Sequence, residues 1–366
     1  MESAESPRRA LPLVEPLPVA GRLSVARLTD AWYVLATSRE LSGKPLARML
    51  YGMPLVLFRD RENRPAALQD RCAHRNAPLS LGRCEAGTIE CPYHGWRFDE
   101  AGRAARIPSL CAPHPERPLV ASFATREQAG LVWIYATPNV EPTHEPFPLA
   151  DLGPGYASVT RMVEAHGTLH ATVENALDVP HTAFLHRGLF RGAGKTHRIR
   201  AVVTRAGDRV QTEYIGEPRP EGLVGRLLSP SGGVVTHYDR FILPSVAEVE
   251  YRIGAENHIL VSAFATPVED TKTRLFAVIR FRTRLPVWLV KLVLEPLALR
   301  IFAQDARMLE RQTETVRVFG GEHFMSTELD LMGPQIGRLL RQAELGKTRP
   351  GNDEPDEWRR EIELEV

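Results

Sequence analysis

The chain has 366 residues, and its 46 Lys and Arg residues nearly balance 45 Asp and Glu residues, which leaves a formal net charge of +1. This balance gives no reason to expect a nucleic acid or an anionic membrane as a partner. The length predicts two ordinary domains with a sizeable core, and the use of only four Cys favours a reducing compartment.

Residues 1–28 are predicted to form an N-terminal arm. Charges and prolines interrupt residues 1–18, where a secretory signal would need an unbroken apolar core, so we expect a cytoplasmic protein. No apolar run reaches the length of a membrane span. The nearest, residues 285–302, is interrupted by charged residues and by Pro296, and it is more typical of a buried or amphipathic helix than of membrane contact.

Residues 29–140 are predicted to form an all-β domain. Runs of apolar, β-branched and aromatic residues predict strands at 32–37, 54–59 and 131–136.

Two short loops among these strands each offer one thiolate and one imidazole. Cys72 and His74 have the spacing Cys-x-His, and Cys91 and His94 have the spacing Cys-x-x-His. The 16 residues between His74 and Cys91 are long enough for a small strand pair that returns the second loop to the first. The pattern therefore predicts a metal site with two Cys and two His ligands.

Two kinds of metal site use such a ligand set. Structural zinc sites usually have Cys-x-x-Cys in one loop and two His in the other. One Cys and one His in each loop instead favours a 2Fe-2S cluster, in which one iron binds both thiolates and the other binds both imidazoles. The remaining cysteines, Cys84 and Cys111, are expected to be free thiols rather than a disulfide.

The second domain is predicted for residues 141–346, after a proline-rich stretch that resists both helix and strand. It opens with a strand-like run at 158–165. Alternating patterns predict five further strands, at 209–215, 234–242, 246–253, 258–265 and 274–282. Consecutive strands flanked by helices indicate an antiparallel sheet with helices on one face, so the predicted fold class is α+β.

Four polar residues follow the first strand of this domain. Asn175, Asp178 and His181 are spaced i, i+3 and i+6, so on an α-helix they could share a face. His186 lies five residues after His181 and would point elsewhere unless the helix loosens or ends between them. Pro180 can cause such a break.

Two imidazoles and one carboxylate on one face of Fe(II) leave open positions for dioxygen. We choose Asp305 as the carboxylate, on a helix that is predicted to continue from the apolar run to residue 319. Glu310 is the alternative, and it would point another way. A further helix is expected at 331–345, and the charged tail at 347–366 is expected to be mobile.

Together these motifs resemble the large (oxygenase) subunit of Rieske non-haem iron oxygenases over residues 29–345. The resemblance implies a Rieske domain followed by a helix-grip catalytic domain, with a 2Fe-2S Rieske cluster and a mononuclear Fe(II) as cofactors. The cluster ligands would be Cys72, His74, Cys91 and His94. The ligands of the mononuclear iron would be His181, His186 and Asp305.

The same resemblance implies roles for the remaining polar residues. Asn175 would lie beside the iron, and Asp178 would bridge His94 of one subunit to His181 of its neighbour. Electron transfer would then require a ring of subunits, most often a homotrimer. The spacing from Asn175 to Asp178 resembles the monooxygenase and demethylase branch and the pheophorbide-oxygenase-like branch.

The implied function is hydroxylation or oxidative demethylation of a hydrophobic aromatic, heterocyclic or polycyclic small molecule with O2. The sequence has no Gly-rich dinucleotide motif and no further Cys set for a ferredoxin. Electrons would therefore come from a separate reductase, a ferredoxin or both. The alternatives are an aromatic-ring cis-dihydroxylating dioxygenase, a desaturase, or a Rieske electron carrier without its own catalysis.

Overall fold

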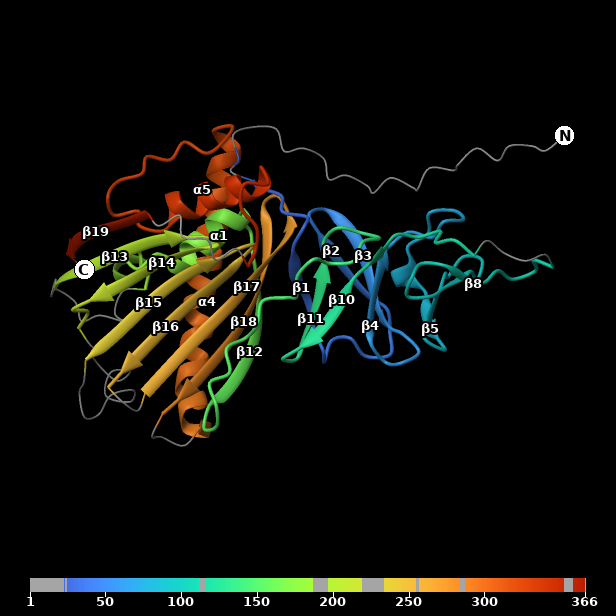
Figure 1. Ribbon diagram of the computed structural model, residues 1–366, viewed down its shortest axis with the longest axis horizontal. Helices are drawn as coiled ribbons and strands as arrows, with labels where there is room; N and C mark the ends of the chain where they lie inside the picture. The colour runs from blue at the N-terminus through green and yellow to red at the C-terminus, as the bar shows by residue number, and fades with distance from the viewer. Residues whose placement is uncertain are drawn as a thin grey trace. The chain divides into compact units, whose positions relative to one another are not determined.

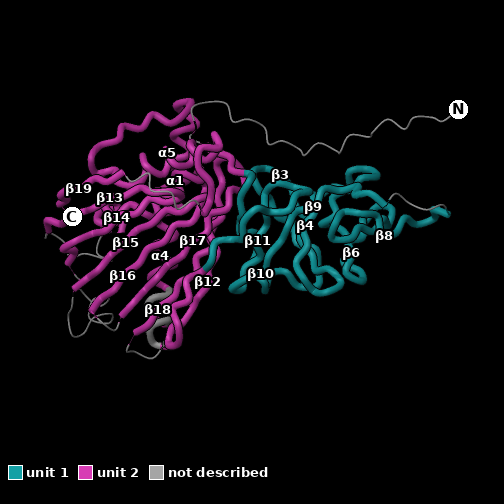
Figure 2. Tube along the Cα trace, in the orientation of Figure 1, with its two compact units in different colours: residues 1–18, 29–148 teal, residues 19–28, 149–366 magenta. Residues whose placement is uncertain are grey.

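The computed structural model describes residues 23, 25–111, 116–186, 197–218, 234–254, 257–283, 287–351 and 358–365. Most of the predicted N-terminal arm lies outside these residues. The chain divides into two compact units (Figure 2). One is built on Thr29–Pro148, and the other on Leu149–Val366 together with Val19–Leu28.

The first unit consists of short antiparallel strands in three sheets (Figure 1). The sheet orders are β1-β11-β10, β2-β3-β4-β9 and β5-β6-β7-β8. Its elements are β1 (Trp32–Thr37), β2 (Leu46–Leu50), β3 (Met53–Arg59), β4 (Pro65–Gln69), the 3₁₀ turn η1 (Leu79–Leu81), β5 (Arg83–Glu85), β6 (Thr88–Glu90), β7 (Arg97–Phe98), β8 (Ala104–Arg106), β9 (Ser122–Phe123), β10 (Thr125–Gln128) and β11 (Leu131–Tyr135). The three strands predicted here correspond to β1, β3 and β11, and the predicted strand pair between the Cys-His loops is β5 and β6.

The core of this unit extends to the two cysteines of the predicted cluster. Cys72 and Cys91 are almost fully buried and belong to a cluster of apolar side chains that includes Phe58, Leu68 and Phe98. The thiols are therefore part of the packed interior, and their positions depend on the same contacts that stabilise the unit.

The second unit contains an eight-stranded antiparallel sheet in the order β12-β18-β17-β16-β15-β14-β13-β19. Its strands are β12 (Ala157–Ala165), β13 (Arg198–Ala206), β14 (Arg209–Ile215), β15 (Val235–Ile242), β16 (Val246–Ile253), β17 (Asn257–Glu269), β18 (Lys272–Arg282) and β19 (Trp358–Glu365). The predicted antiparallel sheet is confirmed. All six strands predicted for this domain are present, although β17 is longer at both ends than predicted.

Two strands of this sheet were not predicted, and one of them corrects an expectation. Residues 358–365 were expected to lie in a mobile tail, but they form β19, which pairs with β13 along its length. The charged residues of β19 alternate with Ile362 and Leu364, and Leu364 is 2% exposed. Trp358, Ile362 and Leu364 lie on one face together with the exposed Arg360, and the other four charged residues lie on the opposite face, as an edge strand can allow.

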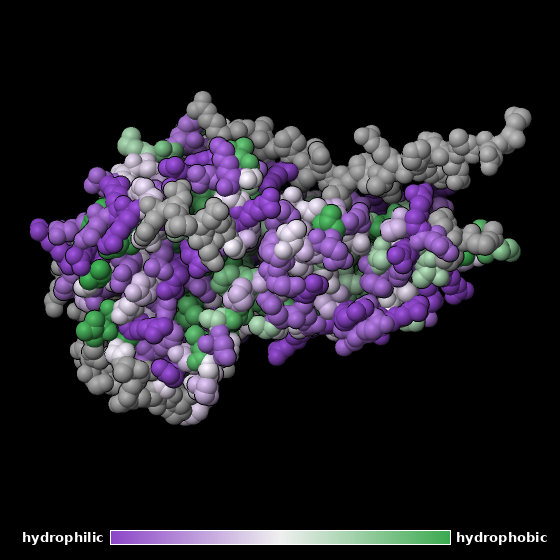
Figure 3. All heavy atoms as spheres, in the orientation of Figure 1, coloured by the Kyte–Doolittle hydropathy of each residue, from purple (hydrophilic) through white to green (hydrophobic). Residues whose placement is uncertain are grey.

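The helices in the described part of the second unit are α1 (Leu169–Leu177), the single turn α2 (Thr182–Leu185), α4 (Val287–Val318) and α5 (Gly333–Glu344). Helix α1 packs against β15, β16 and β17, α4 against β12 and α1, and α5 against α1 and β14. The predicted long helix through Asp305 is thus α4, which runs on past Pro296. No helix in the described part of the chain is long and apolar enough to cross a membrane. The molecular face drawn in Figure 3 is mostly hydrophilic.

One glycine holds the two Cys-His loops close together. A Cβ atom at Gly82 would lie 1.8 Å from the carbonyl oxygen of Glu90, the residue before Cys91. We expect Gly82→Ala to displace this loop, to lower the free energy of unfolding by about 1–3 kcal/mol and to reduce the iron content of the first unit. Thermal unfolding and iron analysis measure both effects.

Gly43→Ala is the matched control, because a Cβ at Gly43 meets no atom within 4 Å. Equal stability and iron content in the two variants would contradict the role given to Gly82.

Candidate metal centres

The two Cys-His loops of the first unit have the same backbone hydrogen-bond pattern. In the first loop the amide of Cys72 donates to Ala77 O, and the amide of Asn76 donates to Cys72 O. In the second the amide of Cys91 donates to the carbonyl of residue 96, and the amide of Gly95 donates to Cys91 O. Asn76 and Gly95 both have positive φ, which ends each turn sharply. The loops thus present their Cys and His side chains in equivalent ways.

The thiols are buried and the imidazoles lie nearer the surface. Burial, together with the hydrogen bond and charge of Cys91, raises the pKa of Cys72 to about 11. The ring centroids of His74 and His94 lie 4.5 Å apart, and His74 stacks on Trp96. Thiols in an apolar interior bind a metal readily as thiolates, because the positive charge of the ion compensates the negative charge of the sulfur.

The donor atoms of these four residues fit a binuclear cluster better than a single zinc ion. A tetrahedral zinc site holds its ligand atoms about 3.3–3.8 Å from one another. In the described part of the chain, no three of Cys72, His74, Cys91 and His94 bring their ligand atoms within 4.8 Å of one another. His74 Nδ1 is buried and has no hydrogen-bond partner. Ligand atoms that lie this far apart, together with a buried His74 nitrogen that has no hydrogen-bond partner, suit a cluster that contains two irons.

The second candidate centre begins where α1 ends. Thr168 caps this helix, since its Oγ1 accepts a hydrogen bond from the amide of Ala171. The helix ends at Leu177, and Asp178 has extended backbone angles. Asp178 and His181 therefore do not share a helical face with Asn175 as the spacing suggested. Pro180 is a cause of the break, because it has no backbone N–H with which to continue the helix and its ring would clash with the carbonyl group four residues before it.

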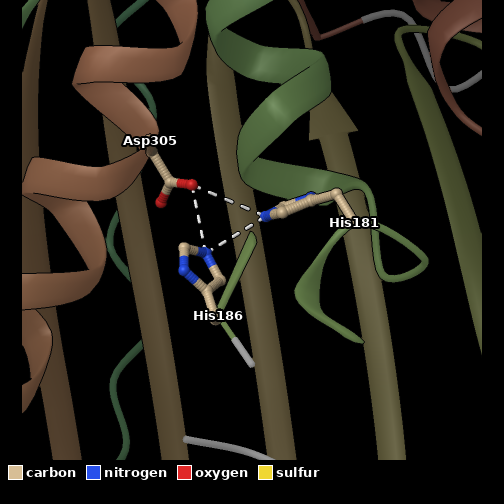
Figure 4. A group of neighbouring side chains, drawn as sticks. All are labelled: His181, His186 and Asp305. Carbon is tan, nitrogen blue, oxygen red and sulfur yellow. Dashed lines mark hydrogen bonds and ion pairs between the residues drawn. The ribbon is translucent and has the colours of Figure 1, made fainter. Parts of the chain in front are cut away.

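The break brings the two histidines together. After Pro180 the chain makes the single turn α2, with His181 at its start and His186 at its end. The Nε2 atoms of His181 and His186 lie 3.2 Å apart. Oδ1 of Asp305, on α4, lies 3.6 Å from Nε2 of His181 and 3.1 Å from Nε2 of His186 (Figure 4). Among the described residues this is the one group of three metal-binding side chains that converge on one point.

The outer nitrogens of both rings face oxygen acceptors. Nδ1 of His186 lies 3.0 Å from Oε1 of Gln304, and Nδ1 of His181 lies 3.4 Å from Oδ2 of Asp178. Protons on the two Nδ1 atoms leave both Nε2 lone pairs for a metal, as is usual for ligand histidines. Burial lowers the pKa of His181, but Asp178 and Asp305 outweigh it and raise that pKa to about 9. A cation is therefore favoured at this point.

The remaining candidates lie apart from this group. Asn175 is half-buried on the last turn of α1, and the structure gives it no hydrogen bond to the three ligand candidates. Glu310 is exposed on α4, whereas Asp305 is 17% exposed and faces the histidines. Gln304 was not predicted as a site residue. Only its place beside Asp305 could have indicated it.

Helix α4 is fixed against the start of α1, and this contact positions Asp305. Oγ1 of Thr313 donates to His166 O at 2.8 Å. Leu309 is buried, and its side chain lies so near Gly167 that an added Cβ there would be 3.5 Å from it. Asp305, Leu309 and Thr313 are spaced four residues apart, so all three lie on the same side of α4.

Comparisons with known proteins match both halves of the chain. Residues 31–124 match the family model of the Rieske [2Fe-2S] domain, and residues 165–344 match that of the Vanillate O-demethylase oxygenase C-terminal domain. The oxygenase component of dicamba O-demethylase from Stenotrophomonas maltophilia is 36% identical over 162 residues, which cover 43% of this chain and 47% of the relative. The oxygenase component of chloroacetanilide N-alkylformylase from Rhizorhabdus wittichii is 31% identical over 221 residues, which cover 58% and 62%.

The fold also matches a solved structure. The crystal structure of dicamba monooxygenase bound to dicamba aligns with a TM-score of 0.75 and 25% identity, over 88% of this chain and 99% of that one. The chain aligns with only about half the length of the first curated relatives.

Gln304 offers a test of the second centre that leaves its three ligand candidates in place. We expect Gln304→Leu to release the ring of His186 and to weaken iron binding about 10–100-fold. Iron retained after dialysis against a graded chelator measures this loss. Gln304→Glu keeps an acceptor for Nδ1 and is expected to retain the iron. Unchanged retention in Gln304→Leu would show that the contact does not support the centre.

Proposed function

We propose that this chain is the oxygenase component of a multicomponent system. The proposal follows from its membership of the Rieske non-haem iron oxygenases. The proposed reaction is hydroxylation or oxidative demethylation of an aromatic, heterocyclic or polycyclic small molecule. The observation that carries the proposal is the convergence of two imidazole nitrogens and one carboxylate oxygen within 3.6 Å of one another, in a chain that also has paired Cys-His loops. An electron carrier without catalysis would not need this second site.

The proposed ligands have separate tasks. When bound, the cluster supplies single electrons and the mononuclear iron activates dioxygen. His181, His186 and Asp305 would hold the iron (Figure 4), and because they supply only three ligand atoms, further positions on it would remain for dioxygen and substrate. Gln304 lies at hydrogen-bond distance from Nδ1 of His186, and Asp178 faces Nδ1 of His181 at 3.4 Å, so both contacts favour the tautomer with its proton on Nδ1.

We assign Asp178 to the contact between subunits. Its side chain is 37% exposed although it lies 3.4 Å from His181, so a residue of a second chain can reach it. His94 is exposed on the first unit. Following the resemblance, His94 of a neighbouring subunit would meet Asp178 in a homotrimer, and electrons would pass through this contact.

The partners follow from the same chemistry. The named relatives are oxygenase components, which supports a separate reductase or ferredoxin as electron donor. Cys84 and Cys111, which are not proposed as cluster ligands, form no disulfide, and this supports a reducing, cytoplasmic location.

Metal content tests the proposal first. We expect about three irons and about two acid-labile sulfides per anaerobically purified chain, with a Rieske electron paramagnetic resonance signal after reduction. We expect His181→Ala to hold about two irons while the Rieske signal persists. Loss of that signal in His181→Ala would mean that the two centres have been confused, and zinc without sulfide in the wild type would overturn the proposal.

The bridging role of Asp178 makes a separate prediction. Asp178→Asn keeps the shape of the side chain and removes its charge. We expect both centres to fill, with turnover reduced at least about a hundredfold. Rapid mixing of the reduced variant with dioxygen and substrate should show slow oxidation of the cluster. Normal cluster oxidation would remove Asp178 from the path.

A further inference from the structure

Three aromatic rings stack across neighbouring strands of the second unit. Tyr214, His237 and Tyr251 lie directly opposite one another on β14, β15 and β16. The ring of His237 is 4.6 Å from that of Tyr214 and 3.9 Å from that of Tyr251, with interplanar angles of 24° and 20°. Residues opposite one another in an antiparallel sheet point to the same face, so the rings form one row.

This row lies on the helix side of the sheet. Thr212 and Asp239 are paired two positions further along the same strands, and Oγ1 of Thr212 donates to Sδ of Met332, immediately before α5. Side chains two residues apart on a strand share a face. The charge of Asp178 is among the causes that raise the pKa of Tyr214, after burial and the charges of Asp239 and Tyr251, so the row lies within electrostatic reach of Asp178.

Two carboxylates bind the imidazole of His237 at both nitrogens. Nδ1 lies 2.7 Å from Oε2 of Glu217, and Nε2 lies 3.0 Å from Oδ1 of Asp239. The side chains of His237, Glu217 and Asp239 are 1%, 10% and 2% exposed. Burial lowers the pKa of His237, but the two carboxylates outweigh it and raise that pKa to about 9. Both ring nitrogens of His237 are hydrogen-bonded to carboxylates, so the imidazole has no N–H left to donate to a ligand. The carboxylate oxygens of Glu217 and Asp239 are therefore the groups that can bind a ligand, as hydrogen-bond acceptors.

An apolar surface continues from these polar residues across the sheet. In register with Asp239 stand Val249 and Val261 and, on β18, Ile279. These three side chains are half-buried although they face the helices. An apolar wall with a few buried polar groups at one end is the usual composition of a small-molecule site.

We propose that Glu217, His237 and Asp239 form a recognition corner that selects uncharged aromatic or heterocyclic substrates carrying an N–H or O–H group and rejects carboxylates. The apolar wall of β16–β18 would contact the ring, and the corner would accept the hydrogen bond. Among the described residues the corner combines two carboxylates with one imidazole. A substrate carboxylate would lose its hydrating water beside groups of like charge. This desolvation costs more free energy than the desolvation of a neutral N–H or O–H group. This inference rests on the proposed oxygenase function.

Binding of ring-matched probes tests the corner without turnover. The holoenzyme is titrated by calorimetry, without dioxygen, with 2-naphthol and 2-naphthoate and with 4-methoxyphenol and 4-methoxybenzoate. We expect each phenol to bind at least about tenfold more tightly than its carboxylate. Carboxylates that bind as tightly as the phenols, or four probes that all fail to bind, would overturn the proposal.

Variants assign the selectivity to the corner. We expect Glu217→Gln and Asp239→Asn each to reduce the preference to less than about threefold. Glu248→Gln is the matched control, because Glu248 is also buried on this sheet but lies on the opposite face, where it accepts from Ser262. An unchanged preference in Glu217→Gln and Asp239→Asn, or an equal loss in Glu248→Gln, would refute the assignment.

Iron, sulfide and the Rieske signal are measured on the same samples. Both centres present without probe selectivity would refute the corner alone. Missing centres would refute the proposed function itself.

Discussion

The register of α4 against α1 is the constraint on which the second centre depends. A metal site tolerates errors of only about 0.5 Å in the positions of its ligand atoms. His186 and Gln304 are 118 positions apart in the sequence, yet their side chains are in contact. The hydrogen bond of Thr313 to His166 O and that of Thr273 to Gly167 O fix α4 and β18 to the segment that precedes α1. The positions of the proposed metal ligands therefore depend on contacts between residues that do not themselves bind the metal.

Much of this arrangement could be predicted because it is local in the sequence. The Cys-His spacings and the alternation of β14 and β16 lie within a few residues, so the chain alone determines them. The sequence predicted that the helix loosens or ends between His181 and His186, whereas α1 already ends at Leu177, ahead of Pro180. The contact of Gln304 with His186 and the pairing of β19 with β13 depend on distant segments, and no short pattern could indicate them. The long-range position of Asp305 was inferred from chemistry, and the structure brings it to both histidines.

The first centre separates its ligands by charge. The thiols of Cys72 and Cys91 lie in the core, whereas His94 is exposed and His74 half-buried. A cluster held there would keep its anionic ligands away from water and present its neutral ligands outward. Burial of the thiolate end also slows oxidative attack on sulfur. Electrons would then enter and leave through an imidazole edge, which agrees with the role proposed for His94.

Strand β19 has a practical consequence for handling the protein. Five of its eight residues are charged, so its sequence looks like a dispensable appendage. A shortened version that stops at residue 351 would remove the strand that covers β13, and would leave unpaired those amide and carbonyl groups of β13 that face away from β14. Such an edge recruits other chains. A truncation chosen to improve crystals or expression would therefore favour aggregation, and the intact carboxy-terminal strand is the better starting point for any engineered variant.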